Sequence, residues 1–129
     1  MRQDLLDDYR VFNAGNDLGC ISADTAHPLP TDVLVEIGPG QGAITYPLLR
    51  AAGRLTVIEL DRDLVEPLKE IAAGPGELIV HNADALSFDF CGLRESEQLR
   101  VIGNLPYNIS TPLLFHLLDQ HHCIRDMHF

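Results

Sequence analysis

The chain has 129 residues, of which 46% are hydrophobic and 22% charged, as in one ordinary globular domain. It has no apolar run of about 18 residues, and its first ten residues lack an apolar signal core, so we expect a cytoplasmic protein without a membrane partner. The formal net charge of −10 has the wrong sign for a stand-alone nucleic-acid-binding protein, which normally carries a basic surface.

The three cysteines, Cys20, Cys91 and Cys123, are widely separated. Their spacing matches neither a metal-binding motif nor a disulfide framework, and no carboxylate pattern completes a metal site with the histidines. We therefore expect reduced thiols and no metal.

Hydrophobic patterning divides the chain near residue 31. Residues 1–30 have no clear period, contain many turn formers and allow only a short helix over 4–11. From Thr31 onward, buried strands alternate with helices. The expected strands are 33–37, 54–60, 78–81 and 99–103, with a fifth opening at 127–129, and the expected helices are 43–52, 62–73 and one beginning at Pro112.

This alternation predicts an α/β fold with a doubly wound parallel sheet. Ligands of such sheets bind beyond the carboxyl ends of the strands. Gly38, Glu59, Asp84 and Asn104 each follow one of the four strands. The sequence therefore predicts one site along this edge of the sheet.

A glycine loop, with Gly38, Gly40 and Gly42, follows the first strand and allows close approach of the backbone to a ligand. Gly38 and Gly40, with Glu59 about twenty residues later, also satisfy a loose dinucleotide-binding fingerprint. An NAD-binding Rossmann domain is therefore an alternative interpretation. A tight turn without a ligand is another reading. Pro39 and the acidic surroundings do not favour the pyrophosphate site that a dinucleotide needs.

Two acids suit S-adenosylmethionine, which offers a ribose, an adenine amine and a charged sulfonium. Glu59 can accept hydrogen bonds from both ribose hydroxyls, and Asp84 can accept one from the adenine amine. The structural alternatives are a solvated carboxylate at a strand end for Glu59 and a turn-forming aspartate for Asp84.

The segment Asn104-Leu105-Pro106-Tyr107 can hold a planar base that carries an exocyclic amine. The Asn104 amide oxygen and the Leu105 carbonyl can accept the two N–H bonds, and the fixed φ of Pro106 helps to aim that carbonyl. Tyr107 can stack on the base once the base has left its stack in the nucleic acid. The structural alternative is a strand-exit turn with Tyr107 in a core.

Four stretches, 35–44, 56–63, 82–85 and 101–112, closely resemble the bacterial small-subunit (16S) rRNA adenine-N6 dimethyltransferases, the family linked to kasugamycin sensitivity. The resemblance implies a Rossmann-like class I methyltransferase fold, S-adenosyl-L-methionine as cofactor, and small-subunit rRNA or the pre-30S particle as partner. It implies dimethylation of two adjacent adenines. By the same resemblance, Gly38, Gly40, Glu59 and Asp84 bind the cofactor, while Asn104 lies between cofactor and target.

The resemblance covers 31–129 and fails over 1–30, where the family's basic, glycine-containing segment has no counterpart. The family also continues beyond residue 129 with the rest of the sheet and a helical RNA-binding domain. We therefore expect 1–30 to be an atypical segment, and 31–129 to be a partial methyltransferase domain with weak or no activity alone. A non-catalytic fragment that binds cofactor or ribosome is the alternative.

Overall fold

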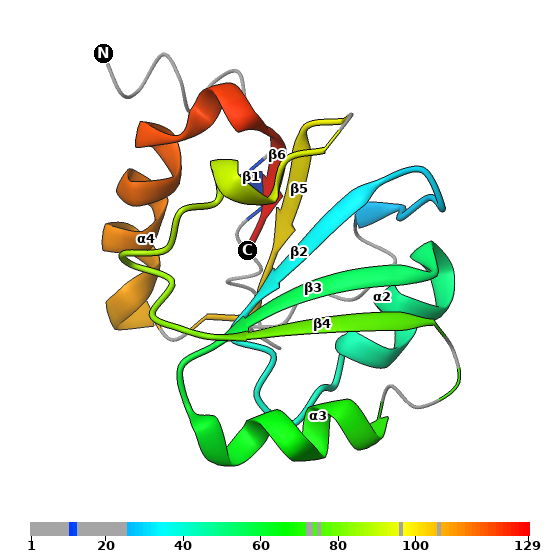
Figure 1. Ribbon diagram of the computed structural model, residues 1–129. Coiled ribbons are helices and arrows are strands. Elements are labelled where there is room, and N and C mark those ends of the chain that lie inside the picture. Colours follow the sequence, from blue (N-terminus) through cyan, green and yellow to red (C-terminus); the bar gives the residue numbers. More distant parts are fainter. Residues whose placement is uncertain (1–10, 13–25, 72–73, 75, 96, 106) are drawn as a thin grey trace.

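The computed structural model describes residues 11–12, 26–71, 74, 76–95, 97–105 and 107–129, and within them it contains one six-stranded parallel sheet (Figure 1). The strand order is β1-β6-β5-β2-β3-β4. The strands are β1 (Val11–Phe12), β2 (Val33–Ile37), β3 (Arg54–Glu59), β4 (Glu77–Asn82), β5 (Leu99–Ile102) and β6 (Ile124–His128). The helices are α2 (Thr45–Ala52), α3 (Val65–Ile71) and α4 (Tyr107–Asp119), and the short 3₁₀ helices are η2 (Arg62–Leu64), η3 (Cys91–Leu93) and η4 (His121–Cys123). The predicted doubly wound α/β class is confirmed.

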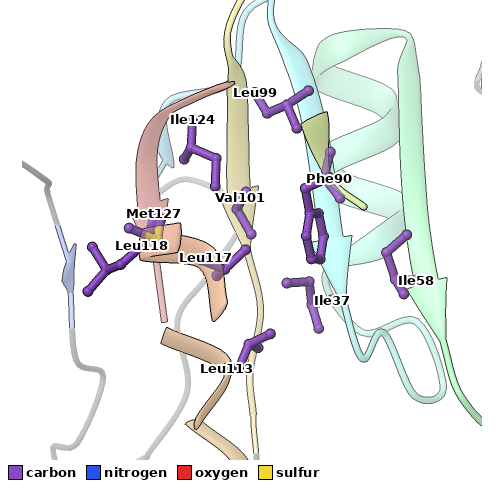
Figure 2. Close-up of a cluster of buried hydrophobic side chains, with 11 residues drawn as sticks. Ile37, Ile58, Phe90, Leu99, Val101, Leu113, Leu117, Leu118, Ile124 and Met127 are labelled. Atoms are coloured by element: carbon purple, nitrogen blue, oxygen red, sulfur yellow. The ribbon is translucent and has the colours of Figure 1, made fainter. Parts of the chain in front are cut away.

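Alternating residues of the strands build two cores, one on each face of the sheet. Leu48 and Leu49 of α2 pack on the face that carries Leu34, Leu55 and Val57. The other face is covered by α4 and by Phe90 from the β4–β5 connector (Figure 2). Its buried members are Val35, Ile37, Ile58, Phe90, Leu99, Val101, Leu113, Leu117, Leu118, Ile124 and Met127. Strands buried on both faces explain the continuous apolar runs in the sequence.

Several predicted boundaries shift by one to three residues, and two predicted elements differ more. Val11, the last residue of the expected 4–11 helix, lies in β1 and pairs in parallel with Met127, while residues 4–10 are outside the described part. Pro112 does not begin a helix but lies inside α4, which begins at Tyr107. A proline there removes one backbone hydrogen bond. Burial of Leu113, Leu117 and Leu118 stabilises the helix beyond it.

A buried ion network joins the amino ends of the central strands to the segment before β2. Arg100 on β5 donates to both carboxylate oxygens of Asp126 on β6, at 3.0 Å through Nε and 3.0 Å through Nη2. Its Nη1 lies 2.7 Å from Asp32 Oδ2, and its Nη2 donates to the Ala26 carbonyl at 2.6 Å. Burial alone would raise the pKa of Asp126, but hydrogen bonds from His128 and Arg100 outweigh it and hold that pKa at about 2.

We predict that Arg100→Met lowers the free energy of unfolding by about 3–5 kcal/mol, because it removes the buried cation that the buried carboxylates of Asp32 and Asp126 share. Arg54→Met is the matched control: Arg54 is half exposed and pairs with Glu77 and Glu95 at the surface, where such pairs contribute about 1 kcal/mol or less. Urea unfolding of both variants measures the difference. Equal losses of unfolding free energy in the two variants would show that the buried network contributes no more to stability than a surface ion pair.

Candidate functional site

The chain reverses its direction of winding between β2 and β5, and the candidate site lies at that point. From β2 the strands proceed through β3 to β4, after which β5 returns to the opposite side of β2. In open parallel sheets this switch point forms the ligand crevice at the carboxyl ends of the strands. Figure 1 shows the glycine loop leaving the sheet at the same side as the end of β3. Gly38 leaves β2 here and Asn104 follows β5.

The two exits are packed against each other through glycines. A Cβ on Gly103 would lie 2.7 Å from the Ile37 carbonyl oxygen, closer than real side chains approach, so only glycine fits. Gly38 has φ +63°, and a Cβ there would meet Leu105 Cδ2 at 3.5 Å. The predicted donor-side loop and the predicted acceptor-side loop are therefore neighbours. Gly103 was not among the predicted site residues, although a glycine directly after a buried strand was a usable signal.

Glu59 joins the glycine loop to the end of β3. Its Oε1 accepts a hydrogen bond from the Gly40 backbone N–H at 3.1 Å, and its Oε2 accepts one from the Asp61 N–H at 3.0 Å. The residue is 7% exposed. A carboxylate has about four lone-pair sites. Each oxygen therefore retains capacity for one further donor, which a pair of ribose hydroxyls could supply.

The other predicted residues have different surroundings. Asp84 is exposed, and its Oδ1 accepts from the Leu86 N–H at 2.9 Å, so it does form the turn that was the alternative to ligand binding. Asn104 and Leu105 are partly buried at the switch point. Tyr107 is the first residue of α4. Its side chain and the whole of Pro106 are outside the described residues, so their predicted roles stay predictions.

Glu36 is a buried acid that was not among the predicted site residues. It is 1% exposed within β2, and Thr45 Oγ1 at the start of α2 donates to its Oε1 at 2.5 Å. Burial raises the pKa of Glu36 to about 7, the Thr45 hydrogen bond opposes the rise, and the nearby Glu59 charge adds to it. A carboxylate inside an otherwise apolar strand was the signal in the sequence.

The expectation of reduced thiols is wrong for two of the three cysteines. Cys91 and Cys123 form a disulfide between segments 32 residues apart. Cys20 is outside the described residues. The fold brings the connector after β4 against the turn after α4, a proximity that spacing along the chain does not reveal.

A cavity of about 330 Å³ lies away from the switch point, over the amino halves of β2 and β3. Its lining includes Val33, Thr56 and the 92–95 connector, and it contains none of the predicted site residues. We therefore place the site by the strand exits and their hydrogen bonds rather than by the cavity. No helix in the described ranges is long and apolar enough to cross a membrane.

The chain is similar in sequence to proteins that modify rRNA. The profile of the family described as ribosomal RNA adenine dimethylase matches residues 21–129. Ribosomal RNA small subunit methyltransferase A of Methylococcus capsulatus is 59% identical over 102 residues, covering 79% of this chain and 40% of that protein. The Nitrosococcus oceani protein of the same name is 60% identical over 104 residues, covering 80% and 39%. The chain thus spans about two-fifths of the length of these relatives.

Solved structures agree on the fold. The 23S rRNA methyltransferase ErmE is similar with a TM-score of 0.64 and 28% identity, over 81% of this chain and 41% of that one. A dimethyladenosine transferase from Plasmodium falciparum has a TM-score of 0.63 and 29% identity, over 77% and 35%. The N-methyltransferase NodS from Bradyrhizobium japonicum, in complex with S-adenosyl-l-homocysteine, shares the fold at 17% identity and a TM-score of 0.54, over 95% and 66%.

The buried Glu36 predicts a specific pH dependence. Its folded-state pKa of about 7 exceeds its ordinary 4.5, so the folded chain holds a proton that the unfolded chain releases. Stability should therefore fall as pH rises from about 4.5 to about 7 and then level off. Glu36→Gln removes this contribution, and we expect it to gain on the order of 3 kcal/mol relative to the parent between pH 4.5 and pH 8.

Chemical unfolding across this pH range measures the effect. Glu70→Gln, on the exposed side of α3, is the matched control and should follow the parent at every pH. If the unfolding free energy of the parent changed with pH as little as that of Glu36→Gln, the prediction would be contradicted.

Proposed function

The chain belongs to the ribosomal RNA adenine dimethylase family, and from that premise we propose that it forms the cofactor-binding part of an rRNA methyltransferase. The proposed reaction transfers methyl groups from S-adenosylmethionine to the N6 nitrogens of two adjacent adenines in small-subunit rRNA. One observation carries the proposal: the Gly38 loop and the Asn104-Leu105 segment meet at the switch point, beside the Glu59 carboxylate. Donor and acceptor need to meet in this way for a direct transfer.

The residues present fit an adenosyl cofactor. A Cβ on Gly40 would have nothing within 4 Å, so the loop borders open space, while its N–H is held by Glu59. Glu59 can orient a ribose through its remaining lone pairs, and Gly38 and Gly40 leave room for the methionine end. Asp84 would accept from the cofactor adenine. Its carboxylate already accepts from Leu86, so the turn fixes its position without using its full accepting capacity.

The acceptor side must make a weak nucleophile reactive. The lone pair of an adenine N6 amine is delocalised into the ring, and two acceptors fixing both N–H bonds would turn that lone pair out of conjugation. The Asn104 side-chain oxygen and the Leu105 carbonyl supply these acceptors, and Tyr107 provides a stacking surface worth about 1–3 kcal/mol. S-adenosylmethionine supplies an electrophilic methyl group. Positioning then contributes much of the rate, without a strong base.

The rRNA and pre-30S partner is also a proposal, supported by the names of the relatives rather than by a basic surface in this chain. With a net charge of −10, the chain has no general electrostatic attraction for a polyanion. We therefore expect cofactor binding to be measurable on the chain itself, whereas transfer is best measured on a full-length relative.

We predict that the chain binds S-adenosylmethionine and that Glu59→Gln weakens this binding about 10- to 100-fold. The glutamine amide can no longer make charge-assisted hydrogen bonds to the ribose hydroxyls. Its NH₂ group would also face one of the two backbone N–H donors, those of Gly40 and Asp61, that the carboxylate accepts from. Glu66→Gln, an exposed acid on α3, should bind like the parent. Isothermal titration calorimetry with S-adenosylmethionine and, separately, NAD measures both. Preferential binding of NAD would replace the proposal with a dinucleotide-binding function.

We predict that the Asn104→Ala change in a full-length relative abolishes methyl transfer to unmethylated small subunits. The amine loses one of its two acceptors, while the fold and cofactor affinity are kept. Transfer is measured with radiolabelled S-adenosylmethionine, and circular dichroism with calorimetry provides the controls. Retained transfer would refute the role of Asn104. Loss of cofactor binding would assign the residue to the cofactor instead.

A further inference from the structure

We propose that Cys91, His122 and Cys123 form a binding site for Zn²⁺ that is available when their disulfide is reduced. The three ligand atoms come from η3 and η4 and lie within 4.8 Å of one another. Thiolate and imidazole are ligands that zinc prefers. The expectation of no metal came from spacing along the chain, which does not detect ligands supplied by two distant segments.

The distance between the Cys91 sulfur and the His122 ring nitrogen fits a tetrahedral site. With metal–sulfur and metal–nitrogen bonds of about 2.3 Å and 2.0 Å, a tetrahedron places sulfur and nitrogen about 3.5 Å apart. Cys91 Sγ and His122 Nε2 are 3.5 Å apart. His122 therefore needs no large movement to share a cation with Cys91.

The two segments are held together by hydrogen bonds that do not depend on the disulfide. Gln120 Oε1 accepts from the backbone N–H groups of Phe90 at 2.7 Å and Cys91 at 3.1 Å. Gln120 Nε2 donates to the Phe88 carbonyl at 3.1 Å. Gln98 Nε2 donates to the His122 carbonyl at 3.1 Å. Reduction thus leaves the ligands near one another, the usual requirement for a preorganised metal site.

The burial of the three ligands indicates how the site is filled. Cys123 is buried, Cys91 is partly buried and His122 is exposed, so a water can supply the fourth ligand from solvent. A dithiol reductant gives two electrons and two protons to the disulfide, which becomes two thiols while the reductant becomes a disulfide. Zn²⁺ then displaces both thiol protons and binds two thiolates and the neutral imidazole. Disulfide and metal are mutually exclusive states of the same sulfur atoms.

The test uses the whole chain, reduced with dithiothreitol and desalted without oxygen, beside an unreduced sample. We expect one Zn²⁺ per reduced chain by elemental analysis after gel filtration and none per oxidised chain. Co²⁺ as a spectroscopic probe should give sulfur-to-metal charge-transfer and tetrahedral d–d absorption. His122→Ala should weaken Zn²⁺ binding on the order of a hundredfold, because it removes the contribution of one ligand to the binding free energy.

Two matched controls make the test decisive. His121→Ala changes the neighbouring histidine, whose Nδ1 lies 3.0 Å from the Leu118 carbonyl, and should bind like the parent. Cys20→Ser should keep the one-to-one stoichiometry. Because His122 is exposed, its variant should retain the parent circular dichroism spectrum. Absence of zinc from the reduced chain, equal effects of the two histidine variants, or undiminished zinc binding by the oxidised chain would each overturn the proposal.

Discussion

The close approach of β5 to β2 at their carboxyl ends is the constraint on which the candidate site depends. Gly103 lies against the Ile37 carbonyl so tightly that a side chain would not fit, and Leu105 reaches the space beside Gly38. Parallel pairing in register, with Glu36 opposite Ile102, sets this approach. Any change that separates the two strands would separate the Gly38 loop, proposed to bind the cofactor, from the segment proposed to hold the adenine.

Charged groups have different structural roles at the two ends of the sheet. At the carboxyl ends, Glu59 joins two loops through backbone N–H groups and keeps accepting capacity for a ligand. At the amino ends, Arg100 is enclosed by two carboxylates and a backbone carbonyl, so its interactions serve the fold. Burial of a charge therefore does not by itself mark a functional site. What distinguishes Glu59 is its place beside the switch point.

Prediction from sequence succeeded for elements whose signal is local. Val33–Ile37 has the bounds expected from its apolar run, and α2 ends at Ala52 as expected, followed by Gly53 in the left-handed conformation. Prediction was weaker where packing overrides local preference: Pro112 was expected to begin a helix, yet α4 begins at Tyr107, and its buried leucines all lie beyond the proline. Val11 joins the sheet through pairing with β6, a partner more than a hundred residues away.

The sequence by itself determined the family, the parallel α/β class and which candidate residues follow the carboxyl ends of the strands, because strand periodicity and short motifs are local properties. Only the tertiary structure decided which of these residues meet. It brought Gly103 against Ile37, gave Glu59 its two N–H donors, raised the pKa of Glu36 by burial, and joined Cys91 to Cys123. Each of these depends on distances between segments far apart in the chain, which are set by strand order and packing rather than by neighbouring residues.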